Sequence, residues 1–251
     1  MARSTGTWSR MQVMRWLASS REYTNFTYEL TPSNELELVS FISRFLGVEP
    51  GRVGTTLAEL YEDEALARHI ADTTRRSRFR YVADPVARYG RRAGWYAFVR
   101  LVKPRLVIET GVDKGLGGCV LASALLRNTA EGALGRYLGI DIDRSAGWLI
   151  TGPYAEVAAV RLASSLTVLR ELEDAVDVFI HDSNHEASYE RAEYRLVSPK
   201  LSADAIIVSD NAHNTRELEA FAAETGRCFD FWSEEPRHWY PGGGIGVAWP
   251  G

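Results

Sequence analysis

The sequence contains very little cysteine: Cys119 and Cys228 are the two among 251 residues, and no C-x-x-C pair occurs. This scarcity excludes a disulfide framework and a cysteine-rich zinc site, and it is typical of proteins of the reducing cytoplasm. No apolar run approaches the roughly 20 residues that a membrane-spanning helix needs. The first residues contain arginines but lack the apolar stretch of a secretory signal. We therefore expect a cytoplasmic protein that makes no use of a membrane.

Charge of one sign is not in large excess either, because the net charge is only −4. A mildly acidic chain is a poor partner for duplex nucleic acid, and we expect none. One basic run stands out between Arg75 and Arg92, where seven arginines accompany a single acid, Asp84. We interpret it as part of an N-terminal helical region whose arginines face solvent or the mouth of an active site. Binding of an anionic partner is the alternative.

The pattern of apolar residues differs between the first part of the chain and the rest. In the first part, apolar residues at helical spacing predict helices over 36–46 and 56–75, with an extended aromatic arm over 23–30. A third helix is predicted over 91–102. From residue 105 onward, short runs rich in Val and Ile alternate with helical segments, which is the pattern of a mostly parallel sheet covered on both faces.

The pattern from residue 105 onward predicts the order of the strands and helices. The expected strands are 106–109, 137–141, 159–162, 176–181, 205–209, 228–232 and 245–249. The expected helices are 115–127, 145–158, 165–172, 186–197 and 214–225. The last two strands have no helix between them and should pair antiparallel. The predicted fold is thus α/β, with a Rossmann-like seven-stranded sheet over 89–251 and an N-terminal helical cap over 1–88.

The turn after the first strand is rich in glycine and begins with an acid, in the pattern E-x-G-x-x-x-G-x-G from Glu109 to Gly117. Glycines here let the backbone approach a ligand at the N-terminus of the following helix. The turn has neither the dinucleotide fingerprint nor the P-loop pattern. An acid in this place would repel a pyrophosphate but suits a ligand that carries an amino group.

Polar residues also follow the second and third strands. Asp141 ends the second strand, where a carboxylate can accept hydrogen bonds from both hydroxyls of a ribose. Ser164 and Ser165 follow the third strand. They either line an adenine pocket or cap the next helix.

Carboxylates end the next two strands. Asp182 follows the fourth strand, and Asp210 and Asn211 follow the fifth. Such oxygen ligands suit Mg²⁺ or Ca²⁺. His185 lies three residues after Asp182 and is a candidate general base. His181 and His185 have the spacing of two zinc ligands, but they would form only half of a zinc site. The alternative is that the acids cap loops and the histidines make structural hydrogen bonds.

Four segments together resemble the motifs of class I S-adenosylmethionine-dependent methyltransferases. They are ETGVDKGLGG (109–118), GIDID (139–143), DVFIHDSNHEASYERAEYRL (177–196) and LSADAIIVSDNAHNTRELEAFA (201–222). The likeness is to a bacterial subgroup akin to small-molecule and natural-product O-methyltransferases, and it covers about residues 89–251.

The resemblance implies S-adenosylmethionine as the cofactor and assigns roles to the residues above. Its cofactor contacts would be Glu109, Gly111, Gly115 and Gly117 for the methionine part, Asp141 for the ribose, Ser164 and Ser165 near the adenine, and His181. Metal-dependent members have Asp, Asp and Asn or Asp at the positions of Asp182, Asp210 and Asn211, which implies Mg²⁺ here. Many relatives have Asp where this chain has Asn184 and Asn211, and the loss of a carboxylate weakens a metal site.

The implied reaction is metal-assisted methyl transfer to a hydroxyl of a small molecule such as a natural product, a sugar or a phenol. His185, with Asp182, would be catalytic, and His213 is a weaker candidate for the base. Tyr23, Phe26, Tyr28 and the segment 231–240 are predicted substrate walls, and the aromatic arm suggests a homodimer. Two alternatives remain: elimination or hydrolysis on the same fold, and a cofactor-binding scaffold without turnover.

Overall fold

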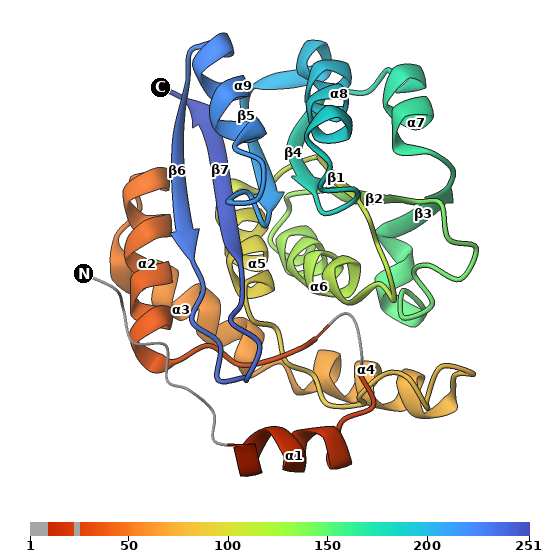
Figure 1. Ribbon diagram of the computed structural model, residues 1–251. Coiled ribbons are helices and arrows are strands. Elements are labelled where there is room, and N and C mark those ends of the chain that lie inside the picture. Colours follow the sequence, from red (N-terminus) through yellow and green to blue (C-terminus); the bar gives the residue numbers. More distant parts are fainter. Residues whose placement is uncertain (1–9, 23–25) are drawn as a thin grey trace.

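The computed structural model describes residues 10–22 and 26–251, and a seven-stranded sheet forms its centre (Figure 1). The strands are β1 Leu106–Thr110, β2 Arg136–Asp141, β3 Ala158–Leu162, β4 Val176–His181, β5 Leu201–Asp210, β6 Arg227–Ser233 and β7 Gly244–Pro250. Their order in the sheet is β3-β2-β1-β4-β5-β7-β6. The first five strands are parallel, while β7 is antiparallel to both β5 and β6.

Helices cover both faces of this sheet. The described residues form α1 Arg10–Ser19, which lies apart from the sheet, and α2 Pro32–Leu46, α3 Pro50–Tyr61, α4 Glu64–Arg76, α5 Arg92–Val102, α6 Leu116–Ala130, α7 Ser165–Glu171, α8 Ala187–Val197 and α9 Glu217–Thr225, with short 3₁₀ turns η1 Gly152–Glu156 and η2 Ser198–Lys200. Apolar residues of α2–α6 pack on one face and those of α7–α9 on the other. The predicted fold class is confirmed.

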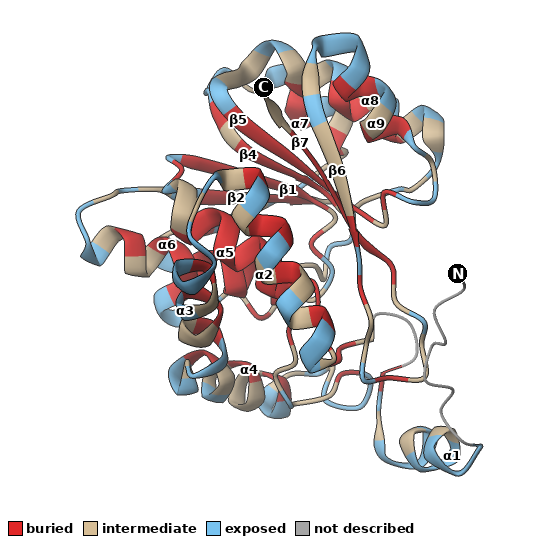
Figure 2. Cartoon of the chain, turned by 90° about the vertical axis from the view of Figure 1, so that its left-hand side faces the viewer, coloured by how far each residue is buried: buried red, intermediate tan, exposed pale blue. Residues whose placement is uncertain are grey.

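Alternation along the strands separates two hydrophobic clusters. In β1, Val107 belongs to the cluster under α5 and α6, while its neighbour Ile108 belongs to the cluster under α7 and α8. Figure 2 shows the inner strands, α5 and α6 as the most buried elements. Leu38, Leu60 and Leu66 of the N-terminal helices share the first cluster, so α2–α4 pack directly on the sheet domain. The predicted division between 1–88 and 89–251 stays a prediction.

The helix predicted over 56–75 is in fact two helices. α3 ends at Tyr61, and the carboxylate of Asp63 accepts a hydrogen bond of 2.9 Å from the backbone N–H of Leu66, which caps α4. The backbone N–H groups in the first turn of a helix have no partner within that helix. An aspartate at the N-cap accepts a hydrogen bond from one of them, which favours the start of a second helix here.

The helix predicted over 145–158 is wrong. This segment forms turns and η1 instead. Gly152 has a φ of +57°, in the left-handed region, and Pro153 follows it with no N–H to give to a helix. Conversely, α1 was not predicted, and none of its residues is buried (Figure 2).

Across the described ranges 10–22 and 26–251, no helix combines the length and the apolar character that crossing a membrane requires.

Candidate functional site

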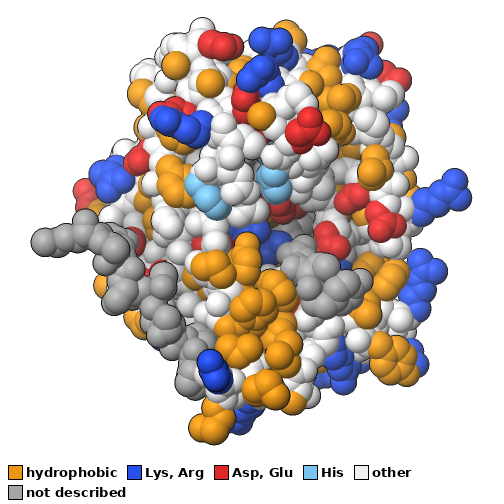
Figure 3. Space-filling model, in the orientation of Figure 1, with side chains coloured by type: hydrophobic (Ala, Val, Ile, Leu, Met, Phe, Trp, Pro, Cys, Tyr) orange, Lys and Arg blue, Asp and Glu red, His pale blue; other side chains and the backbone are white. Residues whose placement is uncertain are grey.

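A pocket of about 630 Å³ lies at the carboxyl ends of the parallel strands, and Figure 3 looks onto the hollow that leads to it. In an open α/β sheet this is the edge where ligands bind, at the point where the strand order reverses. Here the order reverses between β1 and β4. One end of the pocket is lined by Gly111, Ile140, Asp141, Ile142, Ala163 and Ser165. The other end is lined by Phe26, Tyr28, Arg91, Asp182, Asp210 and Tyr240.

Asp141 lines the pocket and also organises its floor. One carboxylate oxygen accepts backbone N–H bonds from Val112 at 2.8 Å and Asp113 at 3.0 Å, and the other accepts one from Asp143 at 2.8 Å. The side chain thus ties the loop after β1 to the loop after β2. A carboxylate has about four acceptor positions, so some remain for a ligand.

Gly111 is the point where the backbones of two strand ends meet most closely. Its φ is +84°, and a Cβ at this residue would lie 2.0 Å from the carbonyl oxygen of Asp182. Any side chain here would push apart the loops that follow β1 and β4, both of which line the pocket.

Gly111→Ala is therefore expected to cost more than the left-handed conformation alone. We expect a loss of roughly 2–5 kcal/mol in unfolding free energy, from left-handed strain and from overpacking against backbone. Gly132→Ala is the matched control, since Gly132 has a φ of +86° and nothing within 4 Å of the added Cβ. Denaturant unfolding should give only about 1–2 kcal/mol for the control. Equal losses in the two variants would contradict the close approach.

Glu109 and two of the predicted glycines do not reach the pocket wall. Glu109 is on the same face of β1 as Val107, under α5 and α6, and its carboxyl accepts a 2.6 Å hydrogen bond from the hydroxyl of Tyr137. A Cβ on Gly117 would meet Glu109 Oε1 at 2.6 Å, and one on Gly115 would lie 3.0 Å from Cα of Gly147, so both pack on protein. Burial raises the pKa of Glu109 to about 8, which makes it a poor charged partner for an amino group.

Of the two serines, one lies at the pocket. Ser165 lines the pocket, and its hydroxyl is 2.8 Å from that of Tyr189. Ser164 is at the N-cap of α7, without a capping bond from its side chain. His181 is fully buried on the α8 side of the sheet, with Nδ1 2.6 Å from Glu193, so it does not line the pocket either.

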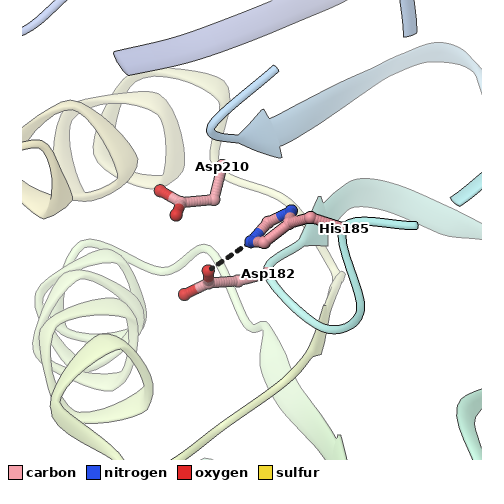
Figure 4. Close-up of side chains that lie close together, drawn as sticks. All are labelled: Asp182, His185 and Asp210. Atoms are coloured by element: carbon pink, nitrogen blue, oxygen red, sulfur yellow. Dashed lines mark ion pairs between the residues drawn. The ribbon is translucent and has the colours of Figure 1, made fainter. Parts of the chain in front are cut away.

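Asp182, His185 and Asp210 lie close together at the ends of β4 and β5, and the imidazole of His185 faces Asp182 (Figure 4). Potential ligand atoms of the three lie within 4.8 Å of one another, and His185 Nε2 is 3.9 Å from Asp182 Oδ1. Burial and the neighbouring charge of Asp210 raise the pKa of Asp182 well above its ordinary value. Burial, followed by the nearby His181, lowers the pKa of His185, so its imidazole is neutral near pH 7. His213, by contrast, is exposed, with its ring 5.9 Å from that of Phe231.

Arg91 is the main site residue that the sequence did not reveal. Its guanidinium donates to both carboxylate oxygens of Asp210, from Nε and, at 2.7 Å, from Nη2. Nη1 donates to the hydroxyl of Tyr28 at 2.8 Å and to Glu234 at 3.2 Å. Burial alone would raise the pKa of Asp210, but this guanidinium outweighs it and holds that pKa below its ordinary value.

The last two arginines of the basic run differ in their positions. Arg91 lines the pocket, in agreement with the prediction that the run faces solvent or the mouth of an active site. Arg92, however, is only 5% exposed and stands over the ring of Trp95 at 5.6 Å, so it faces neither solvent nor the pocket. No local signal in the sequence separates these two arginines from the rest of the run.

Aromatic residues form the outer wall of the pocket. Phe26 and Tyr28 of the arm and Tyr240 of the 231–240 segment line it, while Tyr23 falls outside the described residues. The ring centroids of Phe26 and Tyr240 are 5.5 Å apart. In Figure 3, hydrophobic side chains gather below the hollow, over α1 and the turn that joins β6 to β7.

Known proteins share this architecture. Residues 108–212 match the model of a family described as "Methyltransferase domain". Among solved structures, the O-methyltransferase TomG of Streptomyces achromogenes, involved in tomaymycin synthesis and in complex with S-adenosylmethionine, is 17% identical over 76% of this chain and 91% of its own, with a TM-score of 0.56. A putative O-methyltransferase of Klebsiella pneumoniae is 16% identical over 75% of this chain and 90% of its own, with a TM-score of 0.55.

A third similar structure is that of the Podospora anserina methyltransferase PaMTH1 with bound S-adenosylhomocysteine. It is 14% identical over 77% of this chain and 93% of its own, with a TM-score of 0.53. No curated protein matches the sequence significantly. Residues 108–212 thus match a methyltransferase domain, and the chain shares the fold of these solved structures.

Proposed function

We propose that this protein transfers a methyl group from S-adenosylmethionine to a hydroxyl oxygen of a small molecule. The observation that carries the proposal is one continuous pocket with two chemically different ends. The end at β1–β3 offers the carboxylate of Asp141 beside apolar Ile140 and Ile142, and the end at β4 and β5 offers acids beside an aromatic wall. A volume of about 630 Å³ lies within the range of small-molecule and cofactor sites.

The residues of the first end fit the cofactor. Asp141 keeps acceptor positions for the two ribose hydroxyls, and Ile142, whose side chain is largely exposed, supplies an apolar surface for the adenine. The lack of a side chain on Gly111 leaves room for the backbone to come close to the methionine part. The similar proteins with bound S-adenosylmethionine or S-adenosylhomocysteine support this choice of ligand.

The bound cofactor supplies a methyl group on a sulfonium, which is itself the leaving group. The chain's own residues must then hold the acceptor and remove its proton. Phe26, Tyr28 and Tyr240 would hold the body of the acceptor, and His185, neutral and beside Asp182, would accept the hydroxyl proton. The acceptor oxygen keeps the electron pair with which it attacks the methyl carbon.

A magnesium ion does not fit the described residues as they stand. Both oxygens of Asp210 already accept bonds from Arg91, and the amide nitrogen of Asn211 donates to Asp210 at 2.6 Å. The side-chain carbonyl oxygen of Asn211 is packed against Gly243, because a Cβ added to Gly243 would lie only 2.0 Å from that oxygen. The predicted ligand set of Asp182, Asp210 and Asn211 is therefore not arranged to bind a cation.

Asp141→Ala should weaken cofactor binding, which tests the proposal directly. Loss of a charge-assisted acceptor is expected to cost about 1.5–3 kcal/mol, or roughly 10–150-fold in the Kd for S-adenosylhomocysteine measured by calorimetry. Denaturant unfolding without ligand should also report a loss, because three backbone amides lose their acceptor.

Asp143→Ala is the control from the same loop, since the side chain of Asp143 accepts hydrogen bonds from Ser145 and its backbone N–H, which donates to Asp141, is kept in the variant. It should bind the cofactor as the wild type does. If the wild type binds neither S-adenosylmethionine nor its demethylated product, the proposed function fails. Binding without transfer of labelled methyl to a panel of phenols, catechols and sugars would favour the scaffold alternative.

A further inference from the structure

The cation in the acid-lined end of the pocket is a side chain of this protein. Arg91 precedes α5 and reaches the end of β5, where its guanidinium contacts both oxygens of the fully buried Asp210. Two parallel N–H···O bonds between a planar guanidinium and a carboxylate are among the strongest polar contacts that a protein makes. The pair is well shielded from water, since the side chains are 10% and 0% exposed.

A second set of contacts holds the guanidinium from its other side. Nη1 donates to Tyr28 and to Glu234, and the hydroxyl of Tyr28 donates to the same carboxylate of Glu234 at 2.5 Å. That carboxylate also accepts the backbone N–H of Gly243 at 2.6 Å. Residues from the arm and from the turn between β6 and β7 therefore fix Arg91 in place, so its position does not depend on Asp210 alone.

This arrangement competes with a divalent cation for the same oxygens. A metal ion at Asp210 would have to share the carboxylate with a fixed positive charge, and like charges at such distances repel strongly in a partly dry pocket. Arg91 also lines the pocket, so its charge faces the place where an acceptor hydroxyl would become negative.

We propose that the guanidinium of Arg91 permanently supplies the positive charge that metal-dependent relatives take from a divalent ion, so that Asp182 and Asp210 bind no such ion. Its part in the reaction rests on the proposed methyl transfer, whereas its exclusion of metal does not. Arg91 is a positioning residue in this view: it holds Asp210, and it stabilises the negative charge that remains on the acceptor oxygen when the proton passes to His185.

The test measures Mn²⁺ binding by the electron paramagnetic resonance signal of the free ion. The wild-type protein is expected to bind no Mn²⁺ with a Kd below about 1 mM, the weak limit for protein sites that take hard divalent cations. Arg91→Gln removes the positive charge that holds both oxygens of Asp210, and we expect Mn²⁺ to bind at least roughly tenfold more tightly. Arg91→Lys keeps the charge and should still exclude the ion. Arg44→Gln is the matched control, because Arg44 forms an exposed pair with Asp230 at 2.9 Å, and it should change nothing.

One Mn²⁺ per wild-type chain that is lost in Asp182→Asn and in Asp210→Asn would overturn the inference, even if Arg91→Gln failed to fold. A purely structural Arg91 would lower stability without creating affinity for Mn²⁺. Methyl transfer that stops on chelation and returns with Mg²⁺ would overturn the inference and leave the proposed function standing. If no acceptor is methylated, the proposed function fails, and the Mn²⁺ measurement still decides the question of the metal.

Discussion

His185→Ala is expected to lower turnover roughly 10²–10⁴-fold, the usual contribution of a positioned general base, with the cofactor Kd unchanged. The imidazole Nε2 lies 3.9 Å from Asp182, whereas the ribose is proposed to bind at Asp141. Its side chain is 28% exposed, so its removal should cost little stability. Single-turnover rates with labelled cofactor and calorimetry on the same preparations measure the two quantities separately.

The pH profile gives an independent readout for His185. A base works in its neutral form, and burial lowers the pKa of this imidazole below its ordinary value, so the wild-type rate should stay level through neutral pH and fall only in acid. His185→Ala should lose that acidic limb. His213→Ala is the matched control, since His213 is exposed and its ring lies near Phe231 rather than Asp182, and it should keep both rate and profile. An unaltered rate in His185→Ala would remove it from the mechanism.

The sheet was predictable because its strands are short apolar runs that alternate with helices. Such runs are buried on both faces in a parallel sheet, and all the expected strands exist with ends within a few residues. The rule that ligands bind at the carboxyl ends of the strands then placed Asp141, Asp182 and Asp210 together, and all of them line the pocket.

The side on which a residue points was harder to predict. Glu109 was taken for a pocket residue because it stands near a strand end. Yet it alternates in phase with Val107, which faces α5 and α6, and so it lies beneath the helix rather than in the site. This signal was present in the sequence, since the two residues are two positions apart.

Arg91 could not be found in this way. Its acidic partners, Asp210 and Glu234, are 119 and 143 residues away in the chain. No local pattern distinguishes a buried arginine from the solvated arginines of the same run. Only the packing of α5 against the end of β5 and the turn between β6 and β7 makes it part of the site.

Asp210→Ala should be one of the most destabilising single changes in the site, because it leaves the Arg91 guanidinium buried without its main partner. Breaking a buried ion pair on one side costs about 3–5 kcal/mol of unfolding free energy. Asp230→Ala breaks the exposed pair with Arg44, where the side chains are 40% and 67% exposed, and should cost about 0–1 kcal/mol.

The double variant Arg91→Met/Asp210→Leu removes both charges together, and it separates the two readings of Asp210. If the pair is what stabilises this part of the fold, the double variant should recover most of the stability lost by Asp210→Ala, because no unpaired charge remains. Denaturant unfolding of the wild type, of Arg91→Met, of Asp210→Leu and of the double variant completes the double-mutant cycle.

If Asp210 instead serves chiefly to hold a metal ion, Asp210→Ala in metal-free buffer should be nearly as stable as the wild type. Two negative carboxylates with no cation between them repel, so removing one would relieve strain rather than create it. A loss below about 1 kcal/mol for Asp210→Ala would therefore contradict the buried pair and return the site to the metal-dependent scheme.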